Sequence, residues 1–365
     1  MKNALETYQL ELKVRGPVYI GSGREIQKKE YVFLDKTTVG VVDIEKLYRL
    51  SERKHIVSDL EHFMLEDARE DLKHWASRNK ISKQELEDCM KYTVNAGDIQ
   101  MEKGRMQIMA FVTDPYGTPY IPGSSIKGML RTALLCSDIL ENETKYDADR
   151  QNVLSELKQN VKRNRVLARS IQNIENKAFH TLHKSDKWAD AVNDCMSGII
   201  ISDSEPLNRK QLILCQKWEQ HIDGTYKTLN LLRECIAPGT IIRSTLTIDR
   251  TICQYSVEDI LKAIENFYQM YYTMFQNKFP RNIKGTPLTV FLGGGSGFTS
   301  KTAMYALFGE QDGVRIISEI FEKTGVPSNH KHYKDPRLGV SPHILKCTKY
   351  KGKEYMMGQC ELKIS

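Results

Sequence analysis

The stretch that decides the fold of this chain runs Asp114-Pro115-Tyr116-Gly117-Thr118-Pro119-Tyr120-Ile121-Pro122-Gly123-Ser124-Ser125-Ile126-Lys127-Gly128-Met129-Leu130-Arg131-Thr132-Ala133-Leu134-Leu135. Its first half is rich in proline and glycine, which break regular structure. Its second half places five apolar residues at helical spacing on one stripe, namely Ile126, Met129, Leu130, Ala133 and Leu134. The stretch therefore predicts a turn-rich loop that leads into a helix buried along one side.

The start of this helix is expected to bind an anion. Ser124 or Ser125 is placed to cap the first turn. The glycine and serines that begin the helix leave backbone N–H groups pointing outward, where the helix dipole favours negative charge. Lys127 and Arg131 lie four residues apart beside the apolar stripe. The local prediction is a loop and helix that hold a phosphate.

A second glycine loop, Phe291 to Thr302, is expected between a strand and a helix. A P-loop needs glycine directly before the lysine, and here Ser300 precedes Lys301. The spacing of the dinucleotide-binding fingerprint also fails. What remains is a nest of N–H groups with Lys301 at the helix start, which can hold a phosphodiester without hydrolysing it. The alternative is a tight turn packed against the neighbouring domain.

Composition is that of a globular chain with a modest positive charge. The 365 residues carry a net charge of +7, which is compatible with a nucleic-acid partner. None of the eight cysteines has zinc-knuckle spacing, so buried, reduced thiols are expected. The sequence shows no signal peptide and no apolar run that could span a bilayer, so a cytoplasmic protein is expected. Neither a cofactor nor a metal is expected, because His180 and His183 have ligand spacing without a third ligand.

Several motifs follow one another in an order that resembles a known family. They are Gly16 to Gly23, Ile121 to Thr132, Ser202 to Pro206, Gln216 to Trp218, Gly293 to Gly297, and Tyr355 to Gly358. Together they resemble the RAMP superfamily, the repeat-associated RNA-binding proteins of CRISPR systems. Within it the chain is similar to the subunit that caps the type III-A Csm effector complex. The superfamily usually has histidine at the position of Tyr19.

The resemblance implies an α+β fold of two ferredoxin-like, RRM-like RAMP domains with a helical insertion. Strands interleaved with two helices in each half agree with this βαββαβ plan. The domains are expected at residues 1–208 and 209–365, with helical insertions at about 43–92 and 137–194. The helix from Val257 to Lys278 carries an apolar stripe that is expected to be core, not a base-stacking platform.

RNA contacts are implied in three places. They are expected at Gly21, Ser22, Gly23, Gly123, Ser124, Ser125, Lys127, Arg131, Gly293, Gly294, Gly295, Ser296, Gly297 and Lys301. Two basic segments, 158–169 and 331–353, are either further phosphate contacts or solvated surface. The acidic segment after Asp43 is expected to be a solvated helix face, with a docking surface for a basic neighbour as the alternative.

The function implied is a non-catalytic crRNA-binding subunit that caps the Csm backbone at the 3′ side of the crRNA and supports crRNA maturation. Its expected partners are crRNA, the other Csm subunits, chiefly the repeated backbone subunit, and host nucleases recruited for trimming. The rival is a metal-independent RAMP endoribonuclease that processes crRNA, which needs a converging pair of general acid and base residues. Its candidates, Tyr19, His330 and His343, are scattered in the sequence.

Overall fold

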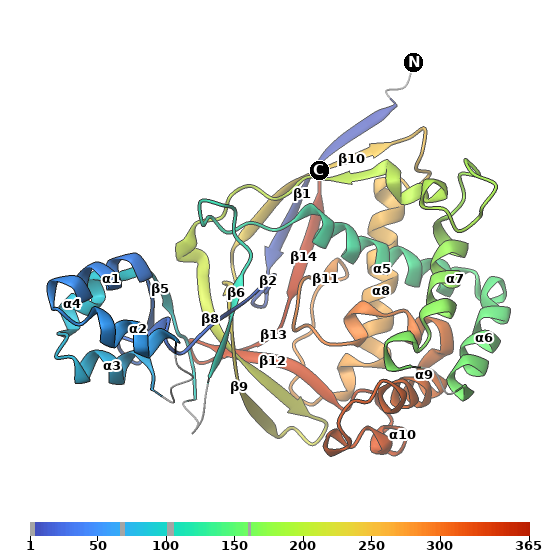
Figure 1. Cartoon of the computed structure of the whole chain (residues 1–365). Helices are drawn as coiled ribbons and strands as arrows, with labels where there is room; N and C mark the ends of the chain where they lie inside the picture. The colour runs from blue at the N-terminus through green and yellow to red at the C-terminus, as the bar shows by residue number, and fades with distance from the viewer. Residues whose placement is uncertain (1–3, 66–69, 101–105, 160–161) are drawn as a thin grey trace.

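The computed structural model describes residues 4–65, 70–100, 106–159 and 162–365. It is a mixed α/β structure in which two β-sheets lie between a small helical lobe and a larger group of helices (Figure 1). None of the described helices combines the length and apolar character that a bilayer crossing needs. All eight cysteines are free and buried, as the sequence predicted.

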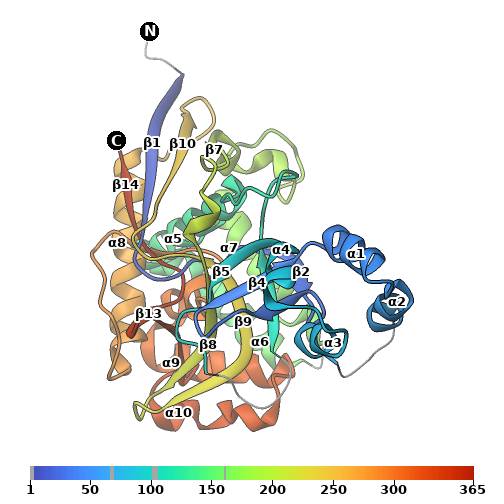
Figure 2. The same ribbon diagram turned by 90° about the vertical axis from the view of Figure 1, so that its left-hand side faces the viewer.

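A five-stranded sheet runs along the part of the molecule where the N- and C-termini lie (Figures 1 and 2). Every neighbouring pair in it is antiparallel. In spatial order the strands are β11 (Thr289–Phe291), β14 (Gln359–Ile364), β1 (Leu5–Val14), β10 (Ile241–Asp249) and β7 (Ile199–Ile201). The sheet thus joins strands from both sides of residue 208, where the sequence analysis placed a domain boundary; that boundary stays a prediction.

Two long helices pack against this sheet and against each other. They are α5 (Gly123–Glu141) and α8 (Val257–Met274). In α5 the predicted stripe is buried at Ile126, Leu130, Ala133 and Leu134. In α8 the aromatic stripe is core, as predicted: Tyr271 is fully buried and its ring lies 4.5 Å from that of Phe291 on β11.

The second sheet connects the central strands to the helical lobe. Its spatial order is β2 (Gly21–Ile26), β6 (Gln107–Phe111), β9 (Tyr226–Ile236), β8 (Leu212–His221), β5 (Met90–Asn95), β4 (Thr38–Val42) and β3 (Tyr31–Phe33). Outside this path, β12 (Ile344–Tyr350) pairs with β8 and with β13 (Lys353–Met356). The antiparallel pairing of β3 with β4 makes a hairpin of residues 31–42.

The insertion after Asp43 forms a helical lobe with a core of its own. Its helices are α1 (Ile44–Arg53), α2 (Val57–Leu65), α3 (Leu72–Arg78) and α4 (Lys83–Asp88). Asp59 and Glu70 are neutralised inside the lobe, since both form ion pairs with Arg78. Glu66, Asp67 and Arg69, which belong to the same acidic segment, lie outside the described residues.

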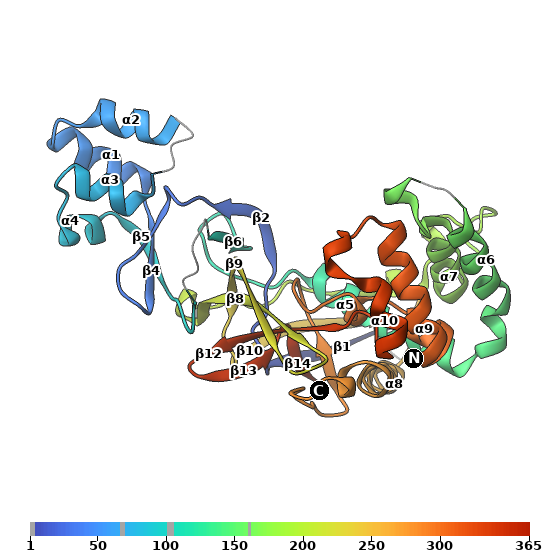
Figure 3. The same ribbon diagram turned by 90° about the horizontal axis from the view of Figure 1, so that it is seen from below.

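The remaining helices gather at the other end of the molecule from the lobe (Figure 3). They are α6 (Asp147–Lys158), α7 (Ala168–Phe179), α9 (Met304–Lys323) and the short α10 (Asp335–Leu338). The helical character predicted for the 137–194 insertion is therefore confirmed over α6 and α7. The helix predicted to begin at Lys301 is wrong at its start, because Thr299–Lys301 is a 3-10 turn and α9 begins at Met304.

Candidate nucleic-acid interface

The glycine loop Gly293–Gly297 follows β11, and its backbone conformation requires glycine. Gly293, Gly295 and Gly297 have φ values of 78°, 87° and 98°, a region that side chains rarely adopt. A Cβ on Gly293 would lie 2.2 Å from the carbonyl oxygen of Tyr19. The loop is therefore held in close contact with the chain segment that ends at Gly23.

This contact brings the first and second glycine motifs together. The N–H of Gly294 donates to the carbonyl oxygen of Tyr19 at 2.7 Å, and the two residues form an isolated β-bridge. The Tyr19 side chain is buried and lies close to Gly21, where a Cβ would be 2.5 Å from its hydroxyl oxygen. Gly21, Ser22 and Gly23 are exposed at the start of β2.

Two cations without acidic partners lie beside this loop. Arg233, on β9, places its guanidinium 5.3 Å from the centre of the Tyr19 ring, and a Cβ on Gly295 would meet one of its Nη atoms at 2.8 Å. Its Nε is buried without a hydrogen-bond partner. Partial burial lowers the pKa of Lys301, and the nearby guanidinium of Arg233 lowers it further. Among the described residues, neither cation forms an ion pair.

A second pair of cations shares one carboxylate. Lys346, on β12, contacts Glu219 at 2.5 Å, and Lys217 contacts the same oxygen at 3.4 Å. Burial lowers the pKa of Lys346, and the neighbouring Lys217 contributes in the same direction. A Cβ on Gly297 would lie 3.5 Å from the Lys346 side chain. One acid thus faces several cations around the loop, so the local charge is positive.

The start of α5 differs from the prediction. Neither Ser124 nor Ser125 caps the helix, because the preceding Pro122 occupies the cap position and no side chain there bonds to the first turn. Instead, the N–H of Gly123 donates to Oδ1 of Asp203 at 2.8 Å. The predicted serine cap is therefore wrong: the helix begins at Gly123, before either serine, and an acidic side chain of this chain satisfies its first amide.

The two predicted cations of α5 have different surroundings. Arg131 forms ion pairs with Asp194 at 2.7 Å and with Glu175 at 3.3 Å. Lys127 is half-buried, and burial lowers its pKa although Asp194 acts against this. Arg131 and Lys301 line one cavity of about 340 Å³ between α5, α7 and α9. The structure therefore brings Arg131 of the α5 motif and Lys301 of the second glycine loop to a common cavity, which Gly21–Gly23 do not line.

Sequence reasoning missed Arg233 and did not predict that the candidate histidines lie close together. Arg233 lies on a strand 60 residues before the loop, and only the pairing of β9 in the second sheet brings it there. His330 and His343, which were scattered in the sequence, both lie near His332, with ring centres at 6.0 and 5.1 Å from its ring. No local sequence signal marks either arrangement.

Comparison with known proteins identifies the family. The RAMP superfamily model matches residues 11–297. The chain is 30% identical over 392 residues to the CRISPR system Cms protein Csm5 of Mycobacterium tuberculosis, covering 100% of this chain and 99% of that protein. It is 27% identical to Csm5 of Streptococcus thermophilus, covering 86% of this chain and 84% of the relative.

Two solved structures share the fold. One is a chain of a Csm–crRNA–target RNA ternary complex of a type III-A CRISPR–Cas system, with a TM-score of 0.64, 20% identity and coverage of 98% of this chain and 100% of the other. The second is Csm5 of T. onnurineus, with a TM-score of 0.60, 17% identity and coverage of 96% and 99%. The chain belongs to the RAMP superfamily and, within it, to the family of the CRISPR Csm5 proteins.

Proposed function

We propose that this chain is the crRNA-binding subunit of a type III-A Csm complex and that it binds RNA without cleaving it. The observation that carries the proposal is the pair Arg233 and Lys301 beside the glycine loop, both without an acidic partner among the described residues. Two like charges held together are destabilising, and a polyanion between them relieves the repulsion. A phosphodiester chain is the ligand that this arrangement fits best.

The proposed grip is independent of RNA sequence. Backbone N–H groups of the loop, apart from that of Gly294, which donates to Tyr19, and the cations around them are suited to phosphate oxygens, which carry no sequence information. Gly21–Gly23 lie on the neighbouring segment and extend the same surface through Tyr19. A subunit that must accept any guide needs contacts of this kind.

The relatives support the biological setting of the proposal. The chain is similar to Csm5 proteins over its full length and shares its fold with a chain of a Csm–crRNA complex. This similarity favours crRNA and other Csm subunits as its partners. In this setting the chain acts in the cytoplasm, caps the backbone at the 3′ side of the crRNA, contacts chiefly the repeated backbone subunit and supports crRNA maturation. Host nucleases recruited to the complex would trim the crRNA.

The finer description of the fold belongs to the same proposal. The order β1, α5, β7, β10, α8, β14 along the chain, with the spatial order β14-β1-β10-β7, is that of a βαββαβ unit. We infer a ferredoxin-like unit whose strands come from both sides of residue 208. The second sheet, with β8 and β9 at its centre, provides Arg233 to the loop of the first unit.

The test measures binding and cleavage in one experiment. The purified chain is incubated with labelled precursor crRNA and with an unrelated RNA of equal length, with and without magnesium, over a range of salt concentrations. The expected result is similar affinity for both RNAs, a steep salt dependence and no cleavage products. Affinity that does not change with salt, or that depends on one sequence, would contradict the proposal.

A second candidate function is the metal-independent endoribonuclease. The observation in its favour is the approach of His330, His332 and His343 to one another, because paired imidazoles can serve as general acid and base. The same incubation decides between the two functions. Products that form without magnesium and vanish in the His343→Ala variant would establish the nuclease and remove the non-catalytic assignment.

A further inference from the structure

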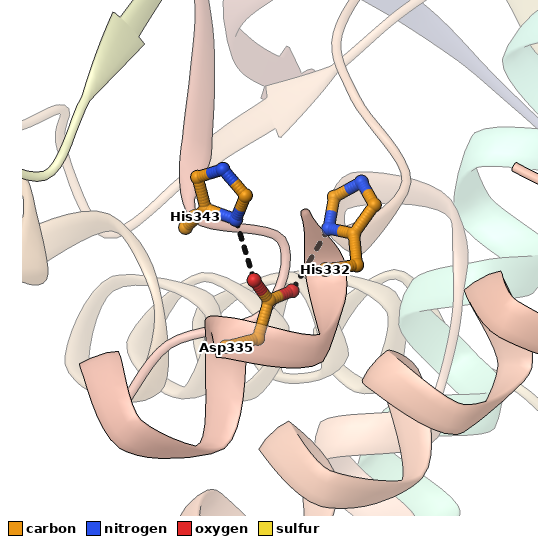
Figure 4. A group of neighbouring side chains, drawn as sticks. All are labelled: His332, Asp335 and His343. Atoms are coloured by element: carbon orange, nitrogen blue, oxygen red, sulfur yellow. Dashed lines mark hydrogen bonds and ion pairs between the residues drawn. The ribbon is translucent and has the colours of Figure 1, made fainter. Parts of the chain in front are cut away.

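Two histidines and an aspartate, His332, Asp335 and His343, form a compact group beside the short helix α10 (Figure 4). Nδ1 of His332 lies 2.9 Å from Oδ2 of Asp335, and Nδ1 of His343 lies 2.5 Å from Oδ1. The Asp335 side chain is fully buried, and the two imidazoles are 9% and 13% exposed. The three residues converge from α10, the 3-10 turn before it and the segment that enters β12.

The charge of Asp335 is met by hydrogen bonds from two imidazoles and the Ser341 hydroxyl, but by no fixed cation among the described residues. Among the described residues, its ion-pair partners are the two imidazoles alone, and neither lysine nor arginine approaches it closely enough to pair. A buried charge is stable only when it is paired or coordinates a metal. Hydrogen bonds from neutral groups leave the net negative charge in place, whereas a divalent cation between the three residues neutralises it.

Groups that would not touch a metal fix the position of the carboxylate. The Ser341 hydroxyl donates to Oδ2 of Asp335 at 2.6 Å. The Tyr305 hydroxyl lies 2.8 Å from the carbonyl oxygen of Ser341 and 3.1 Å from its backbone nitrogen. The ring of Phe321 packs 4.4 Å from that of His332. Hydrogen bonds of this kind to ligating carboxylates are typical of metal sites.

We propose that His332, Asp335 and His343 bind one divalent transition-metal ion, with zinc as the preferred metal. The ligand atoms are Nδ1 of each imidazole and one carboxylate oxygen, and all three lie within 4.8 Å of one another. Zinc bonds of about 2.0–2.1 Å require neighbouring ligand atoms to lie about 3.3 Å apart. Each ligand therefore moves by less than about 1 Å, and each imidazole carries its proton on Nε2.

The ligand set leaves one coordination position open. Three protein ligands of this kind with a water in the fourth position are usual for zinc.

The metal would join the segment that contains His332 and Asp335 to the start of β12, whose Lys346 lies at the glycine loop. Side-chain packing also connects the group to the glycine loop, because the ring of Phe298, which follows the loop, lies 5.1 Å from that of Phe321. The proposed metal thus orders basic residues beside the proposed interface, and its binding is measurable whether or not RNA binds.

Sequence spacing did not predict this group. His332 and Asp335 are three residues apart and His343 follows eight residues later, which matches no common zinc motif. The alternative to a metal is a hydrogen-bonded triad in which one imidazole is protonated. The two alternatives differ in zinc content, so a metal measurement separates them.

The experiment uses the full chain after removal of any affinity tag, because tag histidines bind zinc. After treatment with a chelator, the protein receives a twofold excess of Zn²⁺ and passes through gel filtration. We expect about one zinc per chain by atomic emission and a higher melting temperature than that of the metal-free protein. Substitution with Co²⁺ should give visible absorption bands of a four-coordinate site.

Three variants and one matched control complete the experiment. His332→Ala and His343→Ala should lose the retained zinc, and Asp335→Asn should weaken zinc binding at least tenfold. His330→Ala should keep it, because its ring lies next to the group without contacting Asp335. Wild-type protein that retains no zinc, or His343→Ala that retains as much as wild type, overturns the proposal. If a variant fails to fold, the zinc content of the wild-type protein decides alone.

Discussion

The glycine loop at residues 293–297 and the start of α5 look alike in sequence but differ in how their polar groups are used. Each joins glycine and serine to a nearby lysine, and both were predicted to hold phosphate. At the start of α5 the first amide is bonded to Asp203, and Arg131 is paired with two acids. At the loop, Arg233 and Lys301 have no ion-pair partner among the described residues.

The difference shows that a motif predicts a site only as far as its groups remain unused by the fold. The dipole of α5 favours an anion at its start, and this chain already places its own carboxylate there. The cations at the loop repel one another, which is the arrangement expected of a surface that binds a polyanion. RNA contact at the α5 residues stays a prediction, and the loop is the stronger candidate.

The largest expected effect is the change in the free energy of unfolding when one glycine of each region is replaced by alanine. Gly293→Ala should lower the free energy of unfolding by at least about 2 kcal/mol, because φ is 78° and the new Cβ would meet the Tyr19 carbonyl oxygen at 2.2 Å. Gly128→Ala, in the first turns of α5, is the matched control. Its Cβ would meet nothing within 4 Å, so this variant should gain about 0.5–1 kcal/mol.

Urea denaturation of both variants measures this contrast. Equal stability of Gly293→Ala and wild type would mean that the loop tolerates a different conformation and does not rest on Tyr19. A destabilised Gly128→Ala would mean that this face of α5 is packed more closely than the structure shows.

The next effect compares one lysine from each region. Lys301→Ala should weaken RNA binding about five- to tenfold and reduce the slope of log affinity against log salt by about 0.7, since one phosphate contact to a single strand is lost. Lys127→Ala should change affinity less than twofold, because the nearby Asp194 carboxylate partly offsets its charge, whereas Lys301 has only the Arg233 guanidinium beside it. Fluorescence anisotropy with an unstructured RNA measures both values. A larger effect for Lys127 would reverse the ranking of the two regions.

Much of the fold was predictable because its signals are local. Helical spacing predicted the buried stripes of α5 and α8. The position of the glycine loop was also predictable, since three of its glycines need a positive φ. Short-range patterns of this kind depend on the backbone geometry of a few consecutive residues.

The composition of the site was less predictable because it depends on distant pairings. Arg233 reaches the loop through β9, Asp203 reaches the start of α5 across 80 residues, and His343 meets Asp335 across a turn. Ion pairs to Arg131 likewise come from α7 and from Asp194. Each of these contacts decides whether a charged group is free, and no local pattern records it.

The smallest expected effect asks what Asp203 does at the start of α5. Asp203→Ala removes the acceptor of the Gly123 N–H and should lower the free energy of unfolding by about 1 kcal/mol, as expected for a lost helix cap. Asp203→Asn keeps an acceptor and should lose less. Thermal denaturation of the two variants measures the difference.

RNA binding by the same two variants gives the sharper result. Removing the carboxylate takes away a charge that repels phosphate, so affinity should stay unchanged or rise by up to about threefold. If affinity instead falls in both variants while the protein stays folded, Asp203 positions groups that the RNA contacts. The start of α5 would then be part of the interface. The Asp203 carboxylate would orient the groups of the site without occupying the position of a phosphate.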